Sequence, residues 1–198
     1  DADQMGFPIF PLEWTDPATK EKAMGFREAG YLPEALLNFL AFLGWNPGTT
    51  QELFSLDELI KAFSVERIGK AGTQFDIHKA QWFNQQYLRA KTSEELAAYL
   101  LDSLANENII CPKEKAIKIV SIMRERVTFP KDFWEQAKFL FHAPTTFDES
   151  VAAKKWNDDA VKVLSAYRAE ITKLSAFDAT IAKSTLENVT GGLGIATG

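Results

Sequence analysis

The chain has 198 residues, enough to bury one good hydrophobic core or two small ones, and its 46% hydrophobic and 25% charged residues are typical of a globular protein. The net charge of −5 argues against a general nucleic-acid binder. The sequence has no apolar run long enough to span a bilayer and no signal-peptide pattern, so we expect no membrane partner. The use of one cysteine suits a reducing cytoplasm, where we expect the protein. The single cysteine, Cys111, excludes an internal disulfide framework.

The charge is unevenly distributed along the chain. Residues 1–63 carry ten acidic and four basic side chains, whereas residues 111–142 carry seven basic and four acidic ones. Basic runs are usually solvated helix faces, so this block alone is weak support for binding to a polyanion. Two histidines and one cysteine lie too far apart in sequence for a recognisable metal site, and we expect no metal.

Residues 1–30 predict an irregular N-terminal arm. Proline and glycine are frequent there, and an aromatic and aliphatic cluster between Phe7 and Trp14 suggests an extended segment fixed by its apolar side chains. Exposed aromatic residues often mark a contact with another protein. The arm therefore leaves open a role in protein–protein interaction.

Residues 31–63 predict two helices. Pro33 suits the first turn of a largely apolar helix, which Gly44, Pro47 and Gly48 end. Ser55 and Glu58 have the spacing of a capping box ahead of a short second helix.

The helix that begins after Asp76 has a tryptophan on its polar face. Asp76 is the expected N-cap, and the inward stripe consists of Ile77, Ala80, Phe83 and Tyr87. Trp82 lies opposite that stripe, so we expect it to be partly exposed. Two explanations remain open: another domain covers Trp82, or its ring is a stacking platform for RNA.

From Thr92 onward the sequence predicts only helices. Thr92 or Ser93 caps the first, with Glu95 in its first turn. Further helices are expected at 113–127, 132–141, 149–174 and 176–189, and the glycine-rich tail after 189 is expected to be a loop. The apolar stripe of the 113–127 helix consists of Ala116, Val120, Met123 and Val127.

No set of acids, bases or nucleophiles predicts a catalytic site, so we expect no catalytic residues in this chain. The 113–127 helix instead presents cations. Lys115 and Arg126 are placed on one flank of its apolar stripe, with Arg124 on another side. Solvated side chains and base-reading side chains both fit this pattern.

Several strings resemble one family in order and spacing. They are GYLPEALLNFLAFLGWNPG, FSLDELI, ERIGKAG and KAxWFNxxYLR, all between residues 30 and 89, with weaker similarity beyond. This pattern is similar to bacterial glutamyl-tRNA synthetases just after their catalytic half. The resemblance implies an all-α chain with a tRNA stem-contacting unit at 31–91 and a helical anticodon-binding cage at 92–198. That cage is truncated relative to the family.

The resemblance also implies roles for particular residues. The run IMRERVTFPKDFWEQAKFLF matches a family segment in which an arginine reads an anticodon base, and the matching residue is Arg126. The unit containing Trp82 would lie against the inside corner of the tRNA. Residues matching Arg67, Lys79 and Arg89 would lie near the tRNA backbone.

The implied parent is a class I ligase that charges glutamate tRNA. Its partners would be that tRNA and its own catalytic domain, and it would act as a monomer. ATP and magnesium would belong to the catalytic half, since no HIGH-type or KMSKS-type nucleotide-binding signature occurs in this sequence. The chain itself would bind no cofactor. The alternative from another class is a helical protein-interaction module that does not bind RNA.

Overall fold

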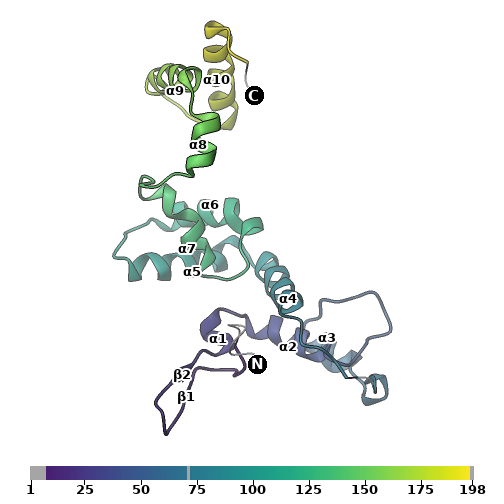
Figure 1. Cartoon of the computed structure of the whole chain (residues 1–198). Coiled ribbons are helices and arrows are strands. Elements are labelled where there is room, and N and C mark those ends of the chain that lie inside the picture. Colours follow the sequence, from purple (N-terminus) through teal and green to yellow (C-terminus); the bar gives the residue numbers. More distant parts are fainter. Residues whose placement is uncertain (1–7, 71, 197–198) are drawn as a thin grey trace. The chain divides into compact units, whose positions relative to one another are not determined.

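The computed structural model describes residues 8–70 and 72–196, and most of them are helical (Figure 1). Packing divides the chain into two compact units, Asp1–His142 and Ala143–Gly198. No helix in the described ranges is both long and apolar enough to cross a membrane. The expected all-α class is confirmed, apart from one small β-ribbon in the arm.

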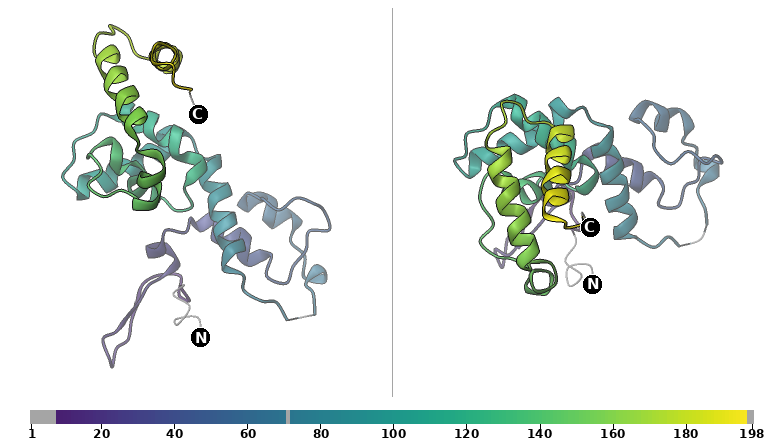
Figure 2. Two further views of the ribbon diagram at one scale, coloured as in Figure 1. Left: turned by 45° about the horizontal axis from the view of Figure 1, so that its top comes forward. Right: turned by 90° about the horizontal axis from the view of Figure 1, so that it is seen from above.

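The N-terminal arm contains a hairpin. Strand β1 (Trp14–Thr15) pairs antiparallel with β2 (Lys22–Ala23), and the hairpin projects from the helices of its own unit (Figure 2). The Asp16 carboxylate accepts hydrogen bonds from the backbone N–H groups of Ala18 and Thr19, at 2.7 and 2.9 Å. This local turn explains why the arm is more regular than its composition predicts. Its first seven residues, Phe7 included, lie outside the described range.

The first helices of the larger unit surround an aromatic core. They are α1 (Phe26–Ala29), α2 (Pro33–Ala41), α3 (Leu56–Ala62), the 3-10 turn η1 (Val65–Arg67) and α4 (Ile77–Ala90). Tyr31, Phe39 and Phe83 are buried in this core. The predicted capping box at Ser55 is present, and the predicted cap Asp76 accepts two backbone hydrogen bonds at the start of α4.

The same unit continues with a helical bundle. Its elements are α5 (Ser93–Asn106), α6 (Lys113–Met123), the 3-10 turn η2 (Arg124–Arg126), α7 (Asp132–Ala137) and the 3-10 turn η3 (Lys138–Leu140). Thr92 caps α5 in a capping box with Glu95. All four residues of the predicted stripe from Ala116 to Val127 are buried. The helices expected at 113–127 and 132–141 are shorter, because each ends in a 3-10 turn.

The two segments expected as separate units share one hydrophobic core. Leu32 and Leu88, from the segment 31–91, lie in the same buried cluster as Leu100, Val120 and Phe133. The division of the chain by packing therefore falls at residue 142, and not near 90–93.

The smaller unit consists of α8 (Glu149–Lys155), α9 (Asp158–Ile171) and α10 (Ala179–Leu193). The prediction of a single helix at 149–174 is therefore wrong. Asn157 interrupts it by accepting a hydrogen bond from the N–H of Ala160 at 2.9 Å as the N-cap of α9. The expected loop after 189 is also wrong in part, because α10 continues through Gly191 to Leu193, and Gly194, whose φ is 68°, is its C-cap.

Candidate nucleic-acid interface

Helix α4 carries the aromatic part of the candidate site. The Lys79 ammonium lies 4.3 Å from the centre of the Trp82 ring and forms an ion pair with Glu52. Trp82 also meets Phe83 edge to face, with ring centroids 5.0 Å apart. Trp82 is half-buried, so its predicted partial exposure is confirmed. A base can stack on the ring face only where the Lys79 side chain leaves it open.

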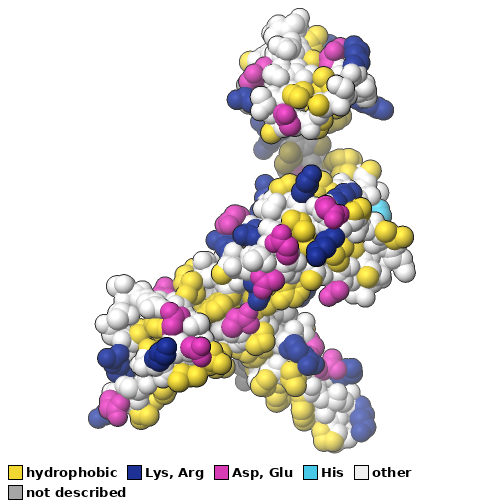
Figure 3. All heavy atoms as spheres, turned by 180° about the vertical axis from the view of Figure 1, so that it is seen from behind, with side chains coloured by type: hydrophobic (Ala, Val, Ile, Leu, Met, Phe, Trp, Pro, Cys, Tyr) yellow, Lys and Arg dark blue, Asp and Glu magenta, His cyan; other side chains and the backbone are white. Residues whose placement is uncertain are grey.

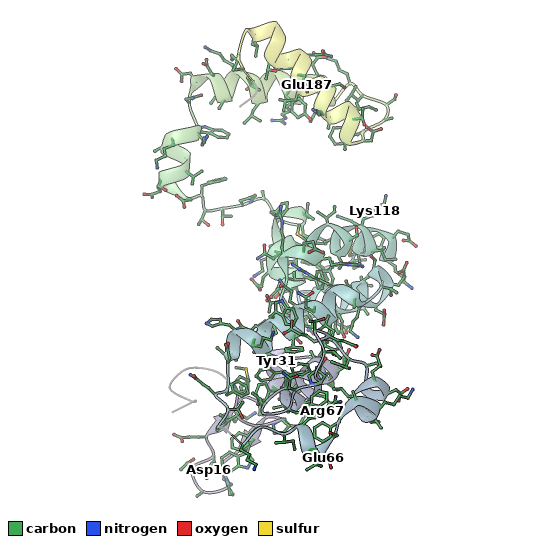
Figure 4. All side chains as sticks on the ribbon, turned by 90° about the vertical axis from the view of Figure 1, so that its right-hand side faces the viewer. Asp16, Tyr31, Glu66, Arg67, Lys118 and Glu187 are labelled. Carbon is green, nitrogen blue, oxygen red and sulfur yellow. The ribbon has the colours of Figure 1, made fainter. Side chains whose placement is uncertain are left out.

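Arg67 lies on the short turn η1 and is exposed. Its Nη1 donates a hydrogen bond to the carbonyl oxygen of Pro47, beside Gly48. Figure 4 shows Arg67 and Glu66 near each other in the lower part of the view. Among the residues that the structure describes, this one hydrogen bond holds the guanidinium against the loop.

Arg89 lies near the end of α4 and reaches the turn η2. Its Nη2 donates to the Glu125 carbonyl oxygen at 2.8 Å and lies 3.1 Å from the Glu125 carboxylate. The side chain is 30% exposed. Arg89 is thus partly engaged within the protein, although it still meets solvent.

Arg126 is exposed, but it is not on the α-helix that the sequence predicts. Helix α6 ends at Met123, and residues 124–126 wind into the 3-10 turn η2. The comparison of flanks between Lys115 and Arg126 on one helix is therefore incorrect. Within the described ranges, the Arg126 guanidinium has no ion pair and no hydrogen bond, so its donors remain free.

The neighbouring cations of the bundle have different surroundings. Lys115 is exposed, and its ammonium lies 4.7 Å from the centre of the Phe141 ring. Arg124 donates from Nη2 to the Ser93 hydroxyl at 2.9 Å, which fixes it against α5. Lys118 points away from the bundle in Figure 4. Of these three cations, Arg124 makes a hydrogen bond within the fold and Lys115 makes a contact with an aromatic ring.

The structure groups the candidate residues into smaller sets. Lys79 and Trp82 are in contact on α4, and Arg89 contacts the turn that carries Arg126. Arg67 and Lys115 lie on other elements. Figure 3 shows basic and acidic side chains interspersed over the face in view, so the charge on that face is mixed. A nucleic acid could therefore bind this face through specific contacts with single side chains, and not through one continuous basic patch.

Sequence reasoning missed Asn84, which is fully buried on α4. Its side chain accepts a hydrogen bond from the N–H of Leu32 at 2.7 Å and donates to the Thr128 carbonyl at 2.6 Å. The signal was its spacing, since Asn84 lies four residues from Ala80 and from Leu88 on the buried face of the helix. A polar residue within an apolar stripe indicates a specific buried hydrogen-bonding role.

An ion pair fixes the end of this helix against α2. Lys91 donates a hydrogen bond to the Glu34 carboxylate at 2.8 Å, and this bond raises the pKa of Lys91. Partial burial acts to raise the pKa of Glu34, but the bond from Lys91 and the local backbone hydrogen bond outweigh it and lower that pKa. Both shifts favour the charged forms, so the pair is intact at neutral pH.

Comparison with known proteins places these residues in a family. The family model for the anticodon binding domain matches residues 83–198. The family model for the catalytic domain of class I tRNA synthetases (E and Q) matches residues 16–82. Helix α4 therefore spans the point where the two matches meet.

Curated relatives are similar in sequence to nearly the whole chain. Glutamate–tRNA ligases from Amoebophilus asiaticus and Cytophaga hutchinsonii are each 52% identical to it, over 94% and 96% of the chain. A crystal structure of a glutamate tRNA ligase from Elizabethkingia meningosepticum, in complex with its amino acid, matches 99% of the chain with a TM-score of 0.92 and 43% identity.

The chain spans only part of those proteins, namely 36% and 37% of the two curated relatives and 39% of the crystallised one. Since the anticodon binding domain model covers more than half of the chain, the chain belongs to the anticodon-binding domain family, and it is similar over almost its full length to the C-terminal part of bacterial glutamate–tRNA ligases.

Proposed function

We propose that this chain binds glutamate tRNA and that Arg126 recognises an anticodon base. The observation that carries the proposal is the state of Arg126: it is exposed on a short turn, within the residues that match the anticodon binding domain, and uncommitted in the described part of the fold. A base offering hydrogen-bond acceptors is a suitable partner for it.

The chemistry of the guanidinium determines which base it tolerates. Arginine presents only donors, so it pairs with an edge of acceptors and is opposed by an edge of donors. The last anticodon base is cytosine in glutamate tRNA and guanine in glutamine tRNA. Cytosine offers two adjacent acceptors on its pairing edge, whereas guanine offers one acceptor and two donors. Arg126 is therefore expected to favour glutamate tRNA.

The other candidate residues would supply contacts that are less dependent on sequence. Lys115 lies in the same bundle as Arg126 and would contact the anticodon arm. Trp82 would provide a stacking surface, with Lys79, Arg67 and Arg89 near phosphates. In this proposal residues 31–91 contact the stem and residues 92–198 hold the anticodon.

The activity of a complete ligase is part of the proposal and is not assigned to these residues. The parent would charge glutamate tRNA in the cytoplasm as a monomer, with ATP and magnesium bound in its catalytic half. The sequence of this chain contains no nucleotide-binding signature, so no catalytic step is assigned to it. Its own task would be to select and hold the tRNA.

The test compares two transcripts that differ only in the last anticodon base. The 198-residue chain should bind the cytosine form more tightly, and Arg126→Gln should reduce that preference by the equivalent of about 1–3 kcal/mol, roughly 5- to 150-fold. Lys118→Gln is a matched control, since Lys118 is an exposed cation of the same bundle. If Arg126→Gln weakens both transcripts by one factor, Arg126 is a phosphate contact and not a reader.

One observation favours the alternative of a protein-interaction module. An apolar groove of about 470 Å³ lies between α2 and α3, with Leu40, Ile60 and Phe63 among its lining residues. A salt titration separates the two functions. Affinity for tRNA should fall steeply as salt rises if phosphates are bound, and tRNA binding should be absent if the chain only binds protein.

A further inference from the structure

The turn that carries Arg126 is held by side chains of α4. On that helix, Arg89 donates to the carbonyl oxygen of residue 125 at 2.8 Å, Gln85 to that of residue 127 at 3.4 Å, and Asn84 to that of residue 128 at 2.6 Å. The three donors come from positions 84, 85 and 89 of α4. They meet carbonyl groups on both sides of Arg126 in sequence.

These contacts lie just beyond the end of α6. The helix ends at Met123, and residues 124–126 form the 3-10 turn η2. The carbonyl groups of residues 125, 127 and 128 follow the helix and accept hydrogen bonds from α4 side chains. The α4 donors therefore bind the backbone of the turn itself.

The far side of the turn is fixed as well. The Asp132 carboxylate accepts hydrogen bonds from the N–H groups of Thr128 and Phe129, at 2.9 and 2.8 Å. Arg124, before the turn, donates to Ser93 at 2.9 Å. The backbone is therefore held on both sides of Arg126, while the guanidinium of Arg126 itself is left free.

We propose that Asn84, Gln85 and Arg89 are positioning residues that fix the turn 124–129 so that Arg126 meets the anticodon base in one orientation. The inference rests on the tRNA-binding role proposed above. A backbone segment held in place before binding loses less conformational freedom when the complex forms, and it limits the positions from which the Arg126 side chain can reach a mismatched base.

Of these three positioning residues, Asn84 is the most deeply buried. Besides Thr128, it holds the backbone N–H of Leu32 and lies 3.4 Å from the carbonyl of Gly30. One side chain therefore joins the residues before α2, the helix α4 and the turn. This places the orientation of Arg126 under the influence of residues that match the catalytic domain model, which covers 16–82.

We call the hydrogen bonds from Asn84, Gln85 and Arg89 to the turn 124–129 the clamp. The first experiment tests the clamp in the free protein, without RNA. Gln85→Met keeps the length and shape of the side chain but removes its donor. Hydrogen exchange of the amides at 124–129 should accelerate about fivefold, the equivalent of one net hydrogen bond, while exchange in α5 stays unchanged. Gln86→Met is the control, since no hydrogen bond joins Gln86 to the turn in the described part of the chain. Equal acceleration in both variants would overturn the clamp.

The second experiment measures the preference between the cytosine and guanine transcripts. Asn84→Asp keeps the acceptor for Leu32 and removes the donors, and it should lower the preference about fivefold or more. Affinity for the guanine transcript should change less than twofold, since no phosphate contact is lost. If Asn84→Asp does not fold, Gln85→Met gives the same comparison with a smaller change. An unchanged preference in a folded variant contradicts the inference.

Arg89 needs its own interpretation, because it is also a candidate phosphate contact. Arg89→Met should lower the preference between the transcripts if the residue positions Arg126. A uniform loss for both transcripts would assign Arg89 to the tRNA backbone and remove it from the clamp.

A combined variant keeps this inference separate from the proposed function. If Arg126→Gln alone leaves the preference unchanged, the reading role of Arg126 fails, whatever the clamp does. If Arg126→Gln abolishes the preference and the clamp variants do not lower it, only the positioning role fails. In the double variant Gln85→Met with Arg126→Gln, the preference should be no lower than with Arg126→Gln alone, because the clamp acts through Arg126.

Discussion

The α5–α7 bundle and the α8–α10 unit are built from similar amphipathic helices, but they differ in what they bury. In the bundle, Leu96, Leu100, Leu104 and Phe133 are fully buried in one continuous cluster. In the described part of the α8–α10 unit, Thr190 is the single buried residue. Most of the free energy that stabilises a helical fold comes from this kind of burial, so the two regions should differ strongly in stability.

The difference shows that caps and helix pattern do not by themselves make a stable unit. Helices α9 and α10 have sound N-caps at Asn157 and Asp178 and pack against each other. A groove of about 560 Å³ nevertheless remains between them, and Leu164 and Leu193 are more than two-fifths exposed. Local signals form the helices, but only a shared core fixes them in place.

The largest expected effect is in hydrogen exchange. Amides in α5 and α6 should exchange only by global unfolding, whereas those in α9 and α10 should exchange through local opening. We expect protection in the bundle to exceed that in α9 and α10 by about a thousandfold or more. Exchange followed by mass spectrometry gives both values in one experiment. Equal protection would mean that the α8–α10 unit is stabilised by something other than burial.

Matched leucine truncations sharpen the comparison. Leu100→Ala removes a fully buried side chain from the bundle and should lower the free energy of unfolding by about 2–5 kcal/mol. Leu164→Ala removes a side chain that is 45% exposed, and it should change the main transition by about 0.5 kcal/mol at most. Urea denaturation followed by circular dichroism measures both. A large loss with Leu164→Ala would place that residue in a common cooperative core.

Sequence patterns predicted the bundle well because its signals are local. The sequence left the cap of α5 open between Thr92 and Ser93, and the structure assigns it to Thr92. This cap and the buried stripe from Ala116 to Val127 both depend on spacings of at most four residues. The candidate site could be predicted only in part. The exposure of Trp82 follows from helical spacing, but the turn around Arg126 depends on donors some forty positions away on α4. Such contacts are invisible to a helical pattern.

The α8–α10 unit was predicted less well for a different reason. Asn157 followed by two aspartates is a local helix start, and that signal was present within the predicted helix 149–174. The glycines near the C-terminus were misleading, because Gly191 is helical and only Gly194 adopts the left-handed conformation that ends α10.

A pair of tyrosines extends the comparison to high pH. Tyr31 is 6% exposed, and burial raises its pKa to about 12. The unfolded chain releases this proton near pH 10, so the stability that Tyr31 contributes is complete below pH 10 and is lost as the pH rises toward 12. Between pH 10 and 12 the parent should therefore lose about 2 kcal/mol of its free energy of unfolding through Tyr31, and the Tyr31→Phe variant should not show this loss.

The matched control for that experiment is Tyr167→Phe in α9. Tyr167 is half-buried and donates its hydroxyl to the Ala182 carbonyl at 3.2 Å. Its replacement should leave the main transition as it is in the parent, because α9 is expected to open on its own. Urea denaturation at pH 8 and pH 11 tests both variants. Parallel behaviour of parent and Tyr31→Phe would show that the Tyr31 hydroxyl meets water in the native state.

The smallest expected effects come from the helix caps, and they test whether the two regions unfold together. Thr92→Ala removes the hydroxyl that accepts the Glu95 N–H at 3.2 Å, and it should lower the free energy of the main transition by about 1 kcal/mol. Asp178→Ala removes the cap of α10, which accepts the Ile181 N–H at 2.8 Å. It should lower the helical signal before the main transition and leave the midpoint unchanged, because α10 is expected to open on its own.

Acid adds a second test of the cap on α5. Hydrogen bonds from the Thr92 backbone N–H and from its hydroxyl lower the pKa of Glu95. The stability from this interaction is present above the unfolded pKa of about 4.3 and is lost as the pH falls through the lower folded value. Thr92→Ala should therefore lose less stability on acidification than the parent does, since one of these bonds is already absent. A parent and variant that lose equal stability between pH 6 and pH 3 would mean that the Thr92 hydroxyl does not stabilise the charged carboxylate, and that its value to α5 lies only in the bond to the Glu95 backbone N–H.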